Sequence, residues 1–183
     1  RISESAFEEL DSDVIPFLES RGAEVFGAVP QEQRLAGVTI EDLAAELGAD
    51  ILTDTPTDDY VERFLVGAMG GDEALRYFRR ARNAAAITGG DRSDIHTAAI
   101  EASGVNCLIL TGGHRPSPAV LGRAEEANTP ILQINTDSLT AVERAESVVR
   151  SGRTRDAETV DTMADLLTER VDLDALVGAD SAD

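Results

Sequence analysis

A short pattern that occurs twice, an apolar run followed by Thr-Gly-Gly, constrains the fold of this chain most strongly. The copies occupy residues 84–92, Ala-Ala-Ala-Ile-Thr-Gly-Gly-Asp-Arg, and residues 107–115, Cys-Leu-Ile-Leu-Thr-Gly-Gly-His-Arg. Each apolar run is too short for a buried helix and ends at glycine, so it predicts a strand buried on both faces. The stretch between them has the length of a helix, and this order of elements predicts parallel pairing with a right-handed crossover.

Parallel strands end at the same edge of a sheet, so both Thr-Gly-Gly turns are predicted at the carboxyl edge, where open α/β sheets tend to bind ligands. A third polar junction, Asn-Thr-Asp-Ser at 135–138, follows another apolar run at 131–134. The expected fold class is therefore α/β, with three layers and a mostly parallel sheet that carries helices on both faces.

The composition limits the classes of partner that the chain is expected to bind. The net charge is −19, and all 16 basic residues are arginine. An acidic surface repels nucleic acid and anionic membranes, so neither is expected as a partner. A chain rich in acidic residues and free of lysine is also typical of salt-loving archaea. The single cysteine indicates a reducing cytoplasm, and we see neither a membrane span nor a signal peptide. Because the first residue is arginine, we expect that a preceding segment has been removed.

Apolar spacing and turn residues predict the remaining elements. Helices are expected at 5–21, 39–47, 72–82, 93–103, 116–127, 138–150 and 154–167, with a frayed tail from 178. Thr39 and Asp42 are placed to begin the second of these helices, and Gly48 to end it. Strands are expected at 23–29 and 60–66 besides the three already named, with a short extended piece at 50–53.

Several pieces, in this order and spacing, resemble the DRTGG domain family. They are Val66-Gly67-Ala68-Met69, residues 87–95 and 107–113, Pro116, and Asp137 with Thr140. The resemblance covers about residues 60–149, and the sequence departs from the family pattern at Ser138-Leu139. It implies a DRTGG-like domain at 60–151. Turn-forming residues predict a linker at 54–59, and a C-terminal helical extension is expected at 152–183. Residues 1–53 resemble the end of a dethiobiotin-synthetase-like P-loop domain.

The resemblance also implies a function. DRTGG domains occur in phosphotransacetylase-like proteins after such a P-loop ATPase domain, and beside CBS domains in some pyrophosphatases. The family is regarded as regulatory or ligand-sensing and tends to form dimers. The chain is thus expected to be a non-catalytic regulatory module that follows a missing ATPase domain and forms a homodimer. Because the Gly-Lys-Ser/Thr phosphate loop is absent, ATP hydrolysis by that route is not expected.

The expected ligand is a nucleotide or a phosphorylated metabolite, and no catalytic or metal-binding residue is assigned. The candidate ligand-binding residues lie at the carboxyl edge: Thr88, Gly89, Gly90, Asp91, Arg92, Asp94, Thr111, Gly112, Gly113, Arg115, Asp137 and Thr140. The glycine N–H groups could hold an anion, or the glycines could only form tight turns. The two arginines could bind phosphate, although pairing with the aspartates is favoured. The aspartates could hold Mg²⁺, although helix capping is favoured.

Other chemistries are less well supported by the residues. His96 and His114 lack the spacing of zinc ligands, and Cys107 in an apolar strand should be inert. Two alternatives to the ligand sensor remain. One is a purely structural dimerisation module that uses the strand at 60–66 and apolar helix faces. The other is an enzyme related to acyl-phosphate or CoA transferases, although no paired nucleophile and base is visible.

Overall fold

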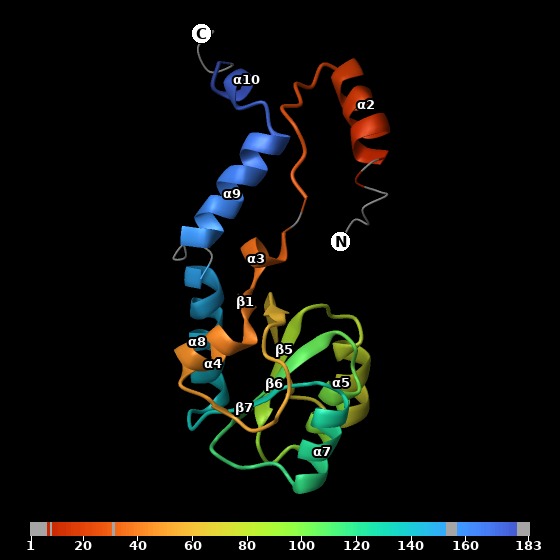
Figure 1. The fold of residues 1–183 in the computed structure, drawn as a ribbon. Coiled ribbons are helices and arrows are strands. Elements are labelled where there is room, and N and C mark those ends of the chain that lie inside the picture. The colour runs from red at the N-terminus through yellow and green to blue at the C-terminus, as the bar shows by residue number, and fades with distance from the viewer. Residues whose placement is uncertain (1–6, 8, 31, 153–156, 179–183) are drawn as a thin grey trace. The chain divides into compact units, whose positions relative to one another are not determined.

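The computed structural model describes residues 7, 9–30, 32–152 and 157–178, and the chain is drawn in Figure 1. It divides into two compact units. One contains residues 36–155, and the other combines residues 1–35 with 156–183. The larger unit holds the candidate ligand-binding residues.

The larger unit is built on a five-stranded sheet in the order β2-β7-β6-β5-β4. Four of its strands are parallel: β4 (Arg63–Val66), β5 (Ala84–Gly89), β6 (Val105–Thr111) and β7 (Ile131–Gln133). The edge strand β2 (Asp50–Ile51) pairs antiparallel with β7. Every residue of β5 up to Thr88 is buried, as expected for a strand covered on both faces.

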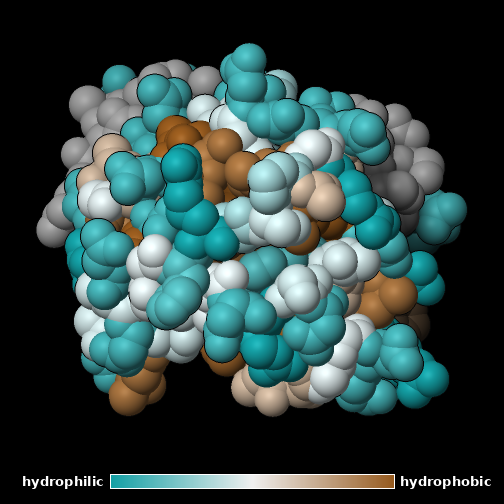
Figure 2. Space-filling model, turned by 90° about the horizontal axis from the view of Figure 1, so that it is seen from below, coloured by the Kyte–Doolittle hydropathy of each residue, from teal (hydrophilic) through white to brown (hydrophobic). Residues whose placement is uncertain are grey.

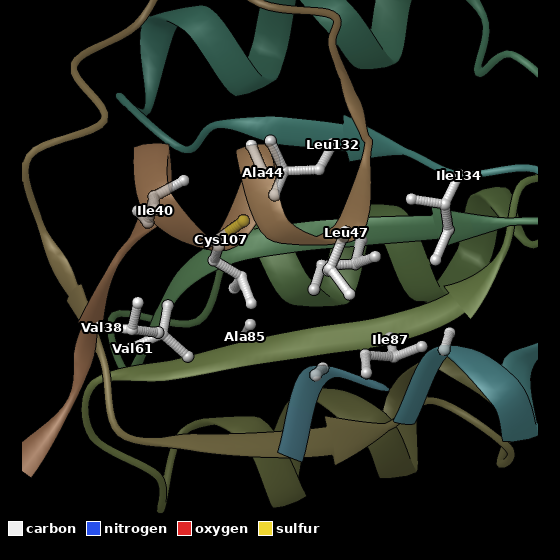
Figure 3. Packing of buried hydrophobic residues seen from close by; sticks show 14 of the residues in the cluster. Val38, Ile40, Ala44, Leu47, Val61, Ala85, Ile87, Cys107, Leu132 and Ile134 are labelled. Atoms are coloured by element: carbon white, nitrogen blue, oxygen red, sulfur yellow. The ribbon is translucent and has the colours of Figure 1, made fainter. Parts of the chain in front are cut away.

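Helices cover both faces of the sheet, which confirms the predicted fold class (Figure 1). One face carries α5 (Gly71–Phe78), α6 (Ser93–Ile100) and α7 (Pro118–Glu126). The other face carries α4 (Ile40–Leu47) and α8 (Ser138–Gly152). Figure 3 shows how Ile40, Ala44 and Leu47 of α4 lie against side chains of the sheet, which include Ala85, Cys107 and Leu132.

Local signals fix the ends of these helices. The Thr39 side chain accepts a hydrogen bond from the Asp42 N–H at 3.1 Å and so caps α4, and Gly48 ends that helix with φ of 63°. Arg144 of α8 donates to the Leu47 carbonyl at 2.9 Å, which satisfies a free carbonyl at the end of α4. The helix predicted from 116 begins instead at Pro118, because Ser117 caps it.

The strand predicted at 60–66 is split. β3 (Tyr60–Val61) pairs antiparallel with β1 (Val38–Thr39) in a separate two-stranded sheet, whereas β4 joins the main sheet. The helix α5 ends at Phe78, four residues earlier than predicted, and Asn83 then takes a positive φ of 49° before β5 begins.

Residues 36–53 belong to the larger unit, although the prediction placed them with a preceding P-loop domain. Leu43 and Leu47 of α4 are buried in the apolar cluster that includes β5 and β6, and β2 completes the main sheet. The predicted linker at 54–59 is held within the same unit, because the Ile40 N–H donates to the Asp59 carbonyl at 3.0 Å. A compact unit therefore begins near Ala36.

The smaller unit contains η1 (Leu10–Val14), α2 (Ile15–Ser20), α9 (Ala157–Arg170) and α10 (Leu173–Gly178), and α3 (Gln33–Ala36) lies at its boundary. The helix predicted at 5–21 is a wide π-helical turn followed by α2, with Pro16 in the first turn of α2. A proline has no N–H for the preceding turn, which explains the irregularity. Residues 5, 6 and 8 of that prediction lie outside the described residues.

The strand predicted at 23–29 was wrong. Only an isolated bridge joins Gly27 to Val171, and the Asp172 N–H donates to the Phe26 carbonyl at 2.7 Å. A Cβ at Gly27 would meet the Arg170 carbonyl, so glycine permits this close approach. The predicted helix start at 154–156 and the tail after Gly178 lie outside the described residues. Among the described residues, no helix has the length and apolarity needed to cross a membrane.

We predict that α4 contributes to the stability of the larger unit. Leu43 has no exposed surface, so Leu43→Ala should lower the free energy of unfolding by about 2–5 kcal/mol through lost burial and a residual cavity. Leu139→Ala is the matched control, because Leu139 is 70% exposed and its loss should cost less than about 0.5 kcal/mol. Urea denaturation measures both, and equal effects would contradict the placement of α4 in this core.

Candidate functional site

Three loops that follow parallel strands meet at the carboxyl edge of the sheet. They are residues 88–94, 111–115 and 135–140, and we call them together the rim. The Gly90 N–H donates to the Thr111 carbonyl at 3.1 Å, and the Gly112 N–H donates to the Thr136 carbonyl at 2.9 Å. Gly89 of β5 is also in register with Thr111 of β6. The predicted juxtaposition of the two Thr-Gly-Gly turns is therefore confirmed.

The two turns have the same sequence but different backbones. Gly112 and Gly113 adopt φ of 78° and 71°, values that favour glycine, whereas Gly89 and Gly90 do not have positive φ. Gly90 is instead required by space, because a Cβ there would meet the carbonyl oxygen of His114 in the neighbouring turn. Each turn thus needs glycine for its own reason.

The glycine N–H groups are already used within the protein. Those of Gly90 and Gly112 bind the carbonyls named above, and that of Gly113 donates to the Ile134 carbonyl at 3.2 Å. A donor bound to a carbonyl is not free to bind a phosphate oxygen. These three groups therefore hold the rim together. They are not available as donors for an anion, which weakens the interpretation of the turns as an anion-binding site.

Hydroxyl groups form a second connection across the rim. Thr88 Oγ1 donates to the Gly67 carbonyl at 3.1 Å, and Thr111 Oγ1 donates to the Thr88 carbonyl at 3.3 Å. Thr111 Oγ1 also lies 2.8 Å from Ser138 Oγ. A hydroxyl has one proton to donate, so Ser138 must be the donor in this last pair. The chain of bonds links the loop after β4 with β5, β6 and α8, and it leaves the two buried threonines without a free proton for a ligand.

Arg92 is held by an acidic neighbour and by the backbone. It makes two contacts of 3.0 Å with the Asp94 carboxylate and donates to the Met69 carbonyl at 2.6 Å. The side-chain hydrogen bond from Arg92 lowers the pKa of Asp94 below its ordinary value, and the same bond raises the pKa of Arg92. The favoured prediction, that this arginine pairs with an aspartate, is confirmed.

Arg115 differs from Arg92. Its side chain is exposed and has no ion-pair or hydrogen-bond partner in the part of the chain that the structure describes. It lies in the loop that contains Gly112 and Gly113, beside the exposed His114, whose Nδ1 is 2.9 Å from the Gly112 carbonyl. Arg115 is thus a cation of the rim that is available to an anionic ligand.

Asp137 and Thr140 cap α8. One carboxylate oxygen of Asp137 accepts from the N–H groups of Leu139 and Thr140 at 3.0 and 3.1 Å, and the other accepts from Thr140 Oγ1 at 2.7 Å. The hydroxyl of Thr140 is the main cause of the lowered pKa of Asp137. The favoured capping interpretation is therefore correct for this aspartate. The described residues contain no cluster of three or more acidic, histidine or cysteine side chains that could hold a metal ion.

His96 contributes to the site and was not predicted to do so. Its side chain is 1% exposed, and its Nε2 lies 3.0 Å from the Gly89 carbonyl, which can only accept. Nε2 therefore carries the proton, and the buried Nδ1 has no partner among the described residues. Burial lowers the pKa of His96, partly offset by the Gly89 bond and by Asp94 and Asp91. No sequence signal indicated this role, because a single histidine in a helix usually has no function beyond packing or exposure to solvent.

The loop after β4 supports the rim and was not among the predicted site residues. The carbonyls of Gly67 and Met69 accept from Thr88 and Arg92, and a Cβ at Gly67 would meet the Ile95 side chain. Two signals were available: the glycine directly after an apolar strand, and the place of Val66-Gly67-Ala68-Met69 among the pieces that resemble the family. The rim lies at the lower end of the larger unit in Figure 1, and Figure 2 views the molecule from below. Hydrophilic residues cover most of that face, with apolar patches between them.

The surroundings of Cys107 do not activate its thiol. It is fully buried in β6, and desolvation raises the pKa of its thiol far above the ordinary value, so a thiolate is not formed there at neutral pH. The prediction that this thiol is unreactive agrees with its buried position in β6.

These features define a three-layer α/β domain with a polar rim at the carboxyl edge of its sheet. The family model of the DRTGG domain matches residues 42–148, more than half of the chain, and the chain therefore belongs to the DRTGG domain family. The match begins within α4, which agrees with the larger unit described above.

A solved structure shares this fold. It contains the CBS and DRTGG domains of the regulatory region of Clostridium perfringens pyrophosphatase, complexed with the activator diadenosine tetraphosphate. The TM-score is 0.54 and the identity is 20%, over 75% of this chain and 69% of that chain. At 20% identity, this similarity supports a shared fold and nothing further.

We predict that His96 makes the stability of the rim depend on pH. Its folded pKa lies below its unfolded value near 6.5, so the unfolded chain binds the extra proton first. The free energy of unfolding should therefore be constant above about pH 7 and should decrease as the pH falls below about 6.5. Denaturation at several pH values should show this slope in the wild type and in His114→Gln but not in His96→Gln. A slope that persists in His96→Gln would assign it to other groups.

Proposed function

We propose that this chain is a regulatory, ligand-sensing and dimerising domain that binds a nucleotide or another phosphorylated metabolite at the rim. We further propose that it belongs to a larger phosphotransacetylase-like protein, in which a P-loop ATPase domain precedes it, and that it works in the cytoplasm. In this role it has no chemistry of its own, and ligand binding changes the behaviour of the neighbouring domain or of the dimer.

The observation that carries this proposal is Arg115, a cation without a partner among the described residues, on a rim whose three glycine N–H groups and two buried threonine hydroxyls are bound within the protein. The backbone donors and buried hydroxyls hold the three loops in one arrangement. Arg115 projects from that arrangement without a partner among the described residues. A rigid frame with an unpaired arginine is suited to a phosphate group, since guanidinium and phosphate form strong forked contacts.

Arg92 offers a second contact and a way to couple binding to structure. Its bond to Asp94 holds the start of α6, and its bond to Met69 holds the loop after β4. A phosphate that replaced the Asp94 carboxylate would loosen this connection. Asp91 and Asp94 oppose a bare phosphate through repulsion, so binding should be moderate and should depend on salt.

The structural neighbour supports the regulatory part of the proposal. That structure contains a DRTGG domain in a regulatory region and was solved with a dinucleotide activator. The pyrophosphatase and this chain share the fold at 20% identity, so ligand binding is carried over here as a hypothesis and not as a finding.

A purely structural dimerisation module is the second candidate. It is favoured by the hydrogen bonds of the Gly90, Gly112 and Gly113 N–H groups, because these backbone donors then hold the fold and are not free to bind an anion. The two candidates differ in one respect, which is whether the rim binds anything.

We predict that Arg115 is needed for binding. Isothermal titration calorimetry of the whole chain with AMP, ATP, diadenosine tetraphosphate and acetyl phosphate should detect at least one ligand. For that ligand, Arg115→Ala should raise the dissociation constant about tenfold or more, because a hydrogen bond to a charged group contributes about 1.5–3 kcal/mol. Arg150→Ala is the matched control. Arg150 lies in the last turn of α8, whereas the rim contains only the first turn of that helix, so loss of Arg150 should not change binding at the rim.

Two results would count against the sensor. Absence of heat with every ligand, in a chain that still forms dimers, would favour the structural module. Equal affinities of Arg115→Ala and the wild type would move the binding site away from the rim.

A further inference from the structure

The helix α5 carries opposite charges at its two ends. Asp72 and Glu73 occupy its first turn, and we call them the acidic end. Arg79, Arg80 and Arg82 follow at its other end, and we call them the basic end. These three arginines are exposed and form no ion pair or side-chain hydrogen bond with any described residue. In a chain with a net charge of −19, an unpaired group of cations needs an explanation.

The helix dipole explains only part of this arrangement. Acidic residues at the start of a helix and basic residues at its end are stabilising within the first and last turns. Within the helix, Arg76 and Glu73 form an exposed ion pair at 3.3 Å. Arg80 and Arg82 lie beyond Phe78, where α5 ends, so the dipole gives little reason for both of them.

The position of α5 leaves one of its sides uncovered by the described elements. β4 is at the end of the strand order, and α5 connects β4 to β5, so it is the outermost helix of its layer. Ala74 and Phe78 are buried in the same cluster as Ile95 of α6, whereas Tyr77 is 47% exposed. Val66 at the end of the edge strand is 41% exposed. The free side therefore combines an unpaired strand edge, an aromatic side chain and separated charges.

We propose that α5 and the edge of β4 form a self-complementary interface with a second copy of this chain. The inference rests on the dimerisation in the proposed function and names its surface. The two copies are related by a two-fold axis near Tyr77, with the two α5 helices antiparallel. The acidic end of each copy then faces the basic end of the other, and the contact occurs twice by symmetry.

Charge complementarity favours a second copy of this chain as the partner at this surface. Two chains with a net charge of −19 repel each other in most orientations, and the antiparallel arrangement is one in which opposite charges meet. A strand edge needs a partner or protection, and β4 pairing with its copy would extend the sheet across the axis. Tyr77 supplies an aromatic contact at the centre, where residues of this kind contribute most to binding.

Charge reversal tests the interface directly. Asp72→Arg/Glu73→Arg makes the acidic end basic, and Arg80→Glu/Arg82→Glu reverses the charge of two of the three arginines at the basic end. We expect light scattering to give a dimer, twice the 19.4 kDa chain mass, for the wild type. Each variant alone should dissociate with a constant at least about tenfold higher, and an equimolar mixture of the two should restore the dimer, because both contacts become attractive again. The control Glu125→Arg/Glu126→Arg, on α7, should stay dimeric.

The outcomes separate this inference from the proposed function. Variants that remain as dimeric as the wild type, or folded variants whose mixture stays monomeric, would overturn the α5 interface and leave ligand binding at the rim untouched. A monomeric wild type at all concentrations would overturn dimerisation itself. Circular dichroism checks the fold of each variant. Where a reversed pair lowers the unfolding midpoint, Asp72→Asn/Glu73→Gln replaces it and should still weaken the dimer.

Discussion

The hydrogen bonds between the three strand-to-helix loops are the constraint on which the rest of this structure depends. The Gly90 N–H reaches the Thr111 carbonyl, and the Gly112 N–H reaches the Thr136 carbonyl, so each loop is tied to the next along the sheet. Thr88 and Thr111 add hydroxyl bonds beneath them. These bonds satisfy backbone groups that would otherwise be left unpaired where the strands end. The rim is therefore a fixed frame, and the side chains that project from it have defined positions.

This frame separates two kinds of polar group. Asp94, Asp137 and Arg92 mostly serve the fold, by pairing with each other or by capping helices. Arg115 neither pairs with a described residue nor caps a helix, so a ligand can bind its side chain without disturbing the fold. The regulatory proposal follows from this division. A ligand that also engaged Arg92 would compete with Asp94 and so act on the start of α6.

The sequence predicted the sheet well, because glycine after a short apolar run is a local signal for a buried strand. It also indicated the caps at Thr39 and Asp137 and the pairing of Arg92. It could not distinguish the two Thr-Gly-Gly turns, since their backbones are set by distant partners such as Thr136 and His114. The strand predicted at 23–29 was wrong because an apolar run forms a strand only where a partner pairs with it. The unpaired Nδ1 of His96 depends on packing that no sequence pattern reports.

Hydrogen exchange of individual amides, followed by NMR on the unliganded chain, tests the fixed frame most directly. We expect the amides of Gly90, Gly112 and Gly113 to exchange slowly, at rates close to those of the buried strands β5 and β6, because all three donate to carbonyls within the protein. Exchange of these glycines at the rate of an unstructured peptide, while β5 and β6 stay protected, would contradict it.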